Sequence, residues 1–113
     1  MFKFEKNPIF KWPVKVQVPV DGGTFEEHVF TARWQVQDSD DLRKAQFAPG
    51  ADPVKVLFER ALKGWEADFV DMAGAPIPFA PEMVDEARRV PHVKTALVQS
   101  YWDACDGGLR AKN

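Results

Sequence analysis

Residues 14–20, Val-Lys-Val-Gln-Val-Pro-Val, decide the fold of the N-terminal part of this chain. Successive side chains of a β-strand point to opposite faces, so the four valines share one face and the lysine, glutamine and proline share the other. This alternation predicts a strand with one face in a hydrophobic core. Pro19 has no N–H to donate to a ladder, so the strand should lie at a sheet edge there or end near it.

A second strand is predicted directly after the first. Residues 21–23, Asp-Gly-Gly, tolerate positive φ, and residues 24–36 then alternate apolar and polar side chains. The apolar face of this strand consists of Phe30, Ala32, Trp34 and Val36. The two segments predict an antiparallel β-hairpin. Phe2 and Phe4 alternate in the same way, so a short first strand is expected to make the hairpin a three-stranded meander.

Two helices are predicted after the hairpin. The first covers residues 38–47 and begins with aspartates that suit an N-cap and a first turn. The second is capped by Asp52 and starts at Pro53, whose missing N–H costs nothing at the first helical position. Its apolar side chains follow at i, i+3, i+4, i+7 and i+8 as far as Leu62. Gly64 is expected just beyond its C-terminus.

Two further helices are predicted near the C-terminus, at residues 81–90 and from Pro91 to Cys105. Met83, Val84 and Ala87 are expected to face inward in the first of them. The outward residues are expected to be Glu82, Asp85, Glu86, Arg88 and Arg89. The last helix carries an apolar stripe made of Val93, Ala96, Leu97, Ser100, Tyr101, Ala104 and Cys105. A glycine pair at residues 107–108 ends it, and residues 109–113 are expected to form a short, flexible basic tail.

The segment 65–79 follows neither the helical nor the strand period. It is predicted to be a short irregular hairpin or an Ω-like loop that turns near residues 71–74. Aromatic side chains and prolines concentrate there. They can form a satellite cluster that holds the loop to the core, or an exposed anchor for a partner protein, because Trp and Phe are common at interface centres. The candidate protein-binding residues are Trp12, Trp65, Phe69, Ile77 and Phe79.

Length and composition limit the fold and the function. A chain of 113 residues suits one hydrophobic core, which predicts a single α+β domain with residues 1–36 β-rich and residues 38–108 mainly helical. The net charge is -2 and both signs are mixed along the chain, so nucleic acid is not an expected partner. Apolar runs are too short to span a membrane. The charged N-terminus and the single cysteine favour the cytoplasm.

No catalytic, cofactor or metal site is predicted. His28, His92 and Cys105 are the only soft metal ligands, and they fall in separate elements. Cys105 lies on the apolar stripe near a helix C-terminus, so it is expected to be buried and unreactive. Carboxylate pairs such as Asp68 and Asp71 are explained as well by turns and solvated charge as by acid–base catalysis. The glycine pairs match no phosphate-binding loop. A small enzyme or a metal-dependent regulator is therefore disfavoured.

A run of short motifs connects the loop to the last helix. In chain order they are Gly64-Trp65, Val70-Asp71, Gly74, Pro76-Ile77-Pro78-Phe79, Pro91-His92-Val93, Ala96-Leu97, Tyr101 and Ala104. Together with Phe30-Thr31-Ala32 of the hairpin, these motifs resemble a group of small phage and prophage proteins classed as tail assembly chaperones. The likeness covers most of the chain. Met72-Ala73 departs from it, because Asp or Asn is expected before the loop glycine.

The resemblance implies a non-enzymatic protein of the bacterial host cytoplasm. It would hold the long helical tape measure protein of a tailed phage while tail tube proteins assemble around it, and it would be absent from the mature virion. The resemblance also implies a longer form made by ribosomal frameshifting. The basic tail would suit as the point where the short and the extended reading frames join. A helical client needs apolar anchors, either the loop aromatics or a strand edge. A structural tail or head-tail joining protein is the alternative function.

Overall fold

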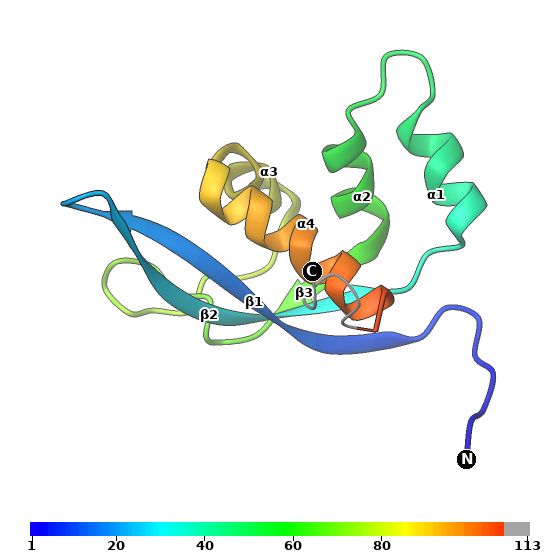
Figure 1. Cartoon of the computed structure of the whole chain (residues 1–113), viewed down its shortest axis with the longest axis horizontal. Helices are drawn as coiled ribbons and strands as arrows, with labels where there is room; N and C mark the ends of the chain where they lie inside the picture. Colours follow the sequence, from blue (N-terminus) through cyan, green and yellow to red (C-terminus); the bar gives the residue numbers. More distant parts are fainter. Residues whose placement is uncertain (108–113) are drawn as a thin grey trace.

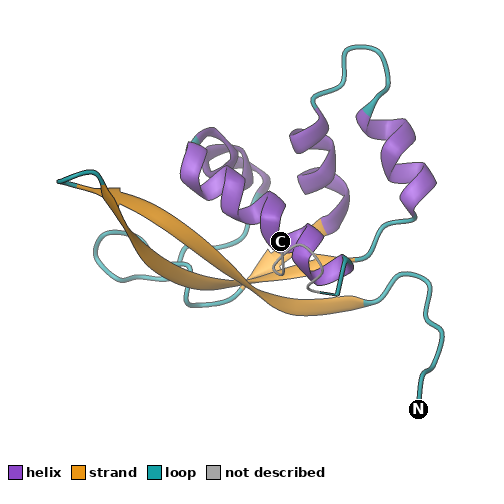
Figure 2. Ribbon diagram, in the orientation of Figure 1, coloured by secondary structure: helices purple, strands orange, loops and turns teal. Residues whose placement is uncertain are grey.

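Three antiparallel strands and four helices make up the part of the chain that the computed structural model describes, residues 1–107. The helices lie on one side of the sheet (Figures 1 and 2). The elements are β1 (Ile9–Val20), β2 (Thr24–Gln35), α1 (Ser39–Gln46), α2 (Pro53–Ala61), β3 (Leu62–Trp65), α3 (Pro81–Arg89) and α4 (Pro91–Cys105). The predicted α+β class is confirmed. The tail expected at residues 109–113 lies outside the described residues.

The hairpin forms as the valine alternation predicts. β1 pairs with β2 from Ile9 opposite Gln35 to Val20 opposite Thr24, and two glycines with positive φ make the turn between them. Val14 and Val16 are buried beneath α4. The sheet order is β1-β2-β3, so β1 is an edge strand, as its proline requires.

The third strand is not where the sequence predicts it. Phe2 and Phe4 lie outside any strand and are 86% and 83% exposed. The third strand is β3, which follows α2 directly and pairs with the C-terminal half of β2. Gly64 therefore lies in a strand opposite Arg33, and its predicted place after a helix C-terminus is wrong. Leu62 is buried, and the extended geometry lets this segment form hydrogen bonds with the edge of β2 that a helix could not make.

Hydrogen bonds that are buried or part-buried, as well as apolar packing, hold α4 to the hairpin and to the segment after it. The Nε1–H of Trp34 donates to Ser100 Oγ at 3.2 Å, and that hydroxyl donates to the Pro13 carbonyl oxygen at 3.1 Å. The backbone N–H of Gln37 donates to the Tyr101 hydroxyl at 3.1 Å. Each polar group on the buried face of α4 thus has a partner, as burial requires. The largest fully buried side chains are Trp34, Tyr101, Phe58, Leu57, Leu97 and Val14.

Two side chains of the last helices differ from expectation. Arg88, predicted to point outward, has a side chain only 19% exposed and forms ion pairs with Asp52 and Asp85, both at 3.6 Å. The pair with Asp52 connects α3 to the N-cap of α2, and it supplies an opposite charge to a partly buried guanidinium. Cys105, predicted to be buried, is exposed. Cys105 borders a cavity of about 450 Å³ between the last turn of α4 and α1, so its side chain has less to pack against.

Candidate protein-binding site

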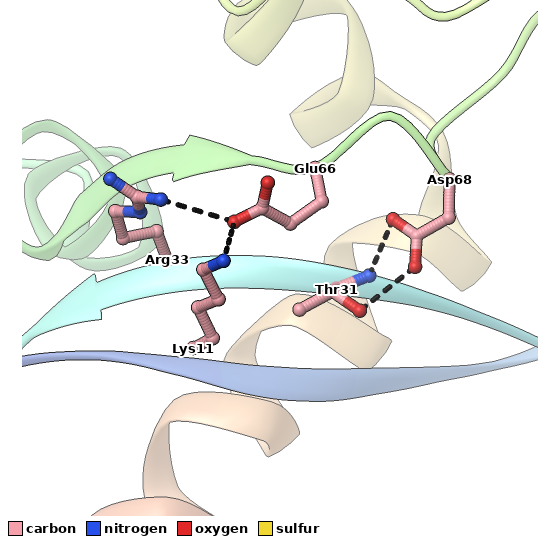
Figure 3. Close-up of polar contacts among 5 residues, drawn as sticks. All are labelled: Lys11, Thr31, Arg33, Glu66 and Asp68. Atoms are coloured by element: carbon pink, nitrogen blue, oxygen red, sulfur yellow. Dashed lines mark hydrogen bonds and ion pairs between the residues drawn. The ribbon is translucent and has the colours of Figure 1, made fainter.

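The loop between β3 and α3 is fastened to the sheet by two carboxylates (Figure 3). Asp68 accepts hydrogen bonds from the backbone N–H of Thr31 at 3.0 Å and from its hydroxyl at 2.8 Å. Glu66 accepts from Lys11 and from Arg33, each at 3.1 Å, and so connects the loop to both strands of the hairpin. These bonds hold the beginning of the loop along the β3-side edge of β2.

Hydrogen bonds from Lys11 and Arg33 hold the pKa of the Glu66 carboxyl below its usual value. A carboxylate with a lowered pKa stabilises the folded state above its ordinary pKa and loses that contribution as the pH falls through the lowered value. The Glu66 side chain is 33% exposed, so the surrounding water screens this effect.

The middle of the loop is an ordered turn. Asp71 Oδ1 accepts from the backbone N–H groups of Ala73 and Ala75 at 2.9 and 3.0 Å. Gly74 has a φ of 83°, and Val70 forms a bridge with Pro76 beside the turn. The predicted irregular hairpin with a turn at residues 71–74 is therefore present. Because the Asp71 side chain supplies the turn's hydrogen bonds, Met72-Ala73 needs no further Asp or Asn.

Four of the five candidate residues come together around this loop. The Trp65 ring lies 4.3 Å from Phe69 and 4.8 Å from Phe79, measured between centroids. Phe69 in turn packs against Phe30 of β2 at 4.6 Å. The Trp65 Nε1–H donates to the Ile77 carbonyl oxygen at 2.7 Å, which ties the two ends of the loop together. Trp65 and Phe69 are half-buried against the core, whereas Phe79 is 39% exposed.

Trp12 is separate from this group. It opposes Ala32 of β2, and Ala32 in turn opposes Trp65, so a whole strand lies between the two tryptophans. Its ring makes an edge-on contact with Phe10 and lines a small cavity beneath α4, with a volume of about 190 Å³. The structure therefore places Trp12 in the packing between hairpin and α4.

Phe79 borders an apolar groove between α2 and α3 with a volume of about 340 Å³. Its apolar walls are Phe58, Leu62, Phe79, Pro81 and Val84, and its charged rim is Lys55, Glu59 and Asp85. Sequence reasoning missed this groove. The apolar periods of α2 and α3 name the wall residues, but no local pattern shows that the two helices diverge enough to leave the groove open.

Residues 1–107 offer no metal centre and no membrane span. This part of the chain holds no group of three or more His, Cys, Asp or Glu side chains placed to bind a metal ion. None of its helices is both long and apolar enough to cross a membrane. No protein-family model, curated protein or solved structure matches this chain.

Proposed function

We propose that this chain is a non-enzymatic phage tail assembly chaperone that binds the helical tape measure protein in the host cytoplasm and is absent from the finished virion. The order of loop and α4 motifs supports this proposal through their resemblance to that family. The observation that carries it in the structure is the partly exposed Phe79 ring at the mouth of the apolar groove between α2 and α3.

The groove matches the chemistry of an amphipathic helix. Such a helix presents apolar side chains at i, i+3, i+4 and i+7, which need an apolar channel with a polar border. Phe58 and Val84 supply opposite walls. The rim carries Lys55 and Glu59 of α2, and Asp85 of α3, which is paired with Arg88. A client helix with charges of both signs beside its apolar stripe would suit this rim. Several segments along one tape measure protein could bind several copies of this chain.

The anchor is already ordered before a client arrives. Prolines on both sides of Ile77 restrict the unfolded loop, and the Trp65–Ile77 hydrogen bond fixes the folded one. Little conformational entropy is then lost when Phe79 is presented to a partner. Tail tube protein could join the same complex as a second partner, through surfaces other than this groove.

Phe79→Ala tests the proposal. We expect binding to a tape measure fragment, measured by calorimetry, to weaken by more than about 1 kcal/mol, the scale of an interface hot spot. Met72→Ala is the matched control, because Met72 is fully exposed at the loop tip and lies outside the groove. It should bind like the wild type.

Circular dichroism and thermal melts of both variants separate lost binding from lost folding. If Phe79→Ala unfolds the chain, Val84→Glu provides a second test, because it puts a charge on the opposite wall of the groove, from a position that is only half-buried. A folded groove variant with undiminished binding would contradict this placement of the client. Stoichiometric amounts of the chain in purified virions would favour a structural tail or joining protein.

A further inference from the structure

The N-terminal half of β2 has an open edge. On the side away from β1, β3 pairs only with residues 32–34 of β2, and the loop after it bonds to Thr31. Within residues 1–107, no strand pairs with residues 24–30 on that side. The hairpin extends well beyond the helices at this end (Figure 1), so they do not cover the edge either.

Residues 25, 27 and 29 direct their backbone polar groups toward this edge. Alternate residues of an antiparallel strand point these groups to opposite sides. Thr31 donates its N–H to Asp68 and accepts from the Glu66 N–H, both on the β3 side, and residues 25, 27 and 29 have the same parity. Pro19, which has no N–H, lies opposite Phe25, which agrees with this assignment.

The side chains of this edge strand are exposed and mixed in character. Phe25 is 65% and Val29 52% exposed, and Glu27 lies between them on the same face. Prolines interrupt the free edge of β1, but none interrupts this segment of β2. Natural proteins usually block such an edge with prolines, lysines or a covering element, because it pairs readily with another strand.

A segment with matching chemistry lies at the other end of the hairpin. Residues 1–6, Met-Phe-Lys-Phe-Glu-Lys, are all exposed, and apolar and charged side chains alternate from Phe2 to Glu5. None of the hydrogen bonds or ion pairs in the described part of the chain involves them. This arm precedes β1 and is free to add to a sheet edge as an extended strand.

We propose that the arm of one copy of this chain adds to the open β2 edge of a second copy as an antiparallel strand, with Phe4 opposite Val29 and Lys6 opposite Glu27. This register pairs an apolar side chain with an apolar one and a cation with an anion on one face of the sheet. Glu5 then lies on the other face, opposite His28, whose Nε2 is already 3.0 Å from Glu26 Oε1, so the proposal depends on the Phe4–Val29 and Lys6–Glu27 pairs. Cross-strand pairs of these kinds are favourable.

The arm cannot reach the β2 edge of its own copy. Asn7 Nδ2 donates to the Val36 carbonyl oxygen at 2.9 Å, and the Val36 N–H donates to the Pro8 carbonyl at 3.0 Å. These bonds hold the base of the arm beside Val36. Glu27 lies nine residues farther along, roughly 30 Å at the rise of a strand, and Lys6 is only one residue from Asn7. The contact therefore joins unlike surfaces of two copies, and each copy donates one arm and offers one edge.

Charge reversal tests this contact. Sedimentation velocity of the full chain at up to about 1 mM, the weak end of specific association, should show self-association of the wild type. Lys6→Glu and Glu27→Lys should each weaken it by roughly three- to tenfold, because each replaces an attractive cross-strand pair with a like-charge one. Mixing the two variants should restore association. The reversed arm of one variant then meets the reversed edge of the other, and the unchanged Lys6 meets the unchanged Glu27, so both contacts pair opposite charges.

Lys3→Glu is the matched control, because it makes the same charge change on the same arm but on its opposite face. It should associate like the wild type. All substituted positions are exposed, and circular dichroism should confirm that the variants stay folded. The proposal is overturned if the wild type is monomeric throughout, if the mixture does not recover, or if Lys3→Glu weakens association as much as Lys6→Glu. Sensitivity to Glu27→Lys but not to Lys6→Glu would also overturn it, because the edge would then take another strand.

Discussion

Leu97→Ala should remove a large part of the stability of this fold. Leu97 lies on the face of α4 that packs against β1, and its exposure is 0%. The substitution deletes three carbon atoms, worth roughly 0.8 kcal/mol each in transfer free energy. A cavity of a few tens of Å³ that fails to collapse adds roughly another 1 kcal/mol. The expected loss is therefore about 3 to 4 kcal/mol, within the range of about 2 to 5 measured for buried leucines.

The assay is urea unfolding followed by circular dichroism and tryptophan fluorescence. The free energy of unfolding should fall and the slope against urea should stay constant, because the exposed area hardly changes. Thr95→Ala is the control, because Thr95 is exposed on the same helix and should change stability by less than about 0.5 kcal/mol. A loss below about 0.5 kcal/mol for Leu97→Ala would show that α4 does not pack against the hairpin in this way.

Three experiments on ionisable side chains test other details of the structure. Burial raises the pKa of Tyr101, the only tyrosine, to about 12. Its contribution to stability should be complete below pH 10 and lost as the pH rises through about 12. Tyrosinate absorbance of folded protein that titrates at 10 would contradict this. Glu66→Gln should remove a loss of stability that the wild type shows below about pH 4.5, and unchanged acid melts would refute that sign. Cys105 is exposed, so it should react with a thiol reagent in the folded protein. Partial burial of the thiol itself, and secondarily the Asp106 charge, raise the pKa of Cys105, so the reaction should be slower than in the unfolded protein. Equal rates would contradict this.

Local patterns predict the elements of this fold well where one physical signal dominates. The valine alternation gives β1, and the aspartates before α1 and α2 accept the backbone hydrogen bonds expected of N-caps. Prolines at the first helical positions mark the starts of α2, α3 and α4. In each case the deciding interaction joins residues close in sequence, which is why the sequence alone suffices.

The predictions are wrong where contacts between residues far apart in sequence decide the conformation of a segment. Leu62 and Gly64 fit the end of a helix, but pairing with Trp34 and Arg33 makes them a strand. Phe2 and Phe4 alternate like a strand, but prolines interrupt the free edge of β1, and the open edge of β2 is out of their reach.

The candidate site was predictable only in part. Clustering of aromatics in the loop follows from composition, whereas the separation of Trp12 from that cluster depends on strand register. The groove beside Phe79 depends on how α2 and α3 pack, and Arg88 of α3 bridges to Asp52, the N-cap of α2. No short motif carries that information.

The most direct test of the proposed function is co-expression of this chain with the tape measure protein of the phage or prophage that encodes it. The proposal predicts a soluble complex that purifies together, weakened by Phe79→Ala but not by Met72→Ala, and purified virions that lack the chain. A tape measure protein that is equally soluble without the chain and does not co-purify with it would contradict the proposal.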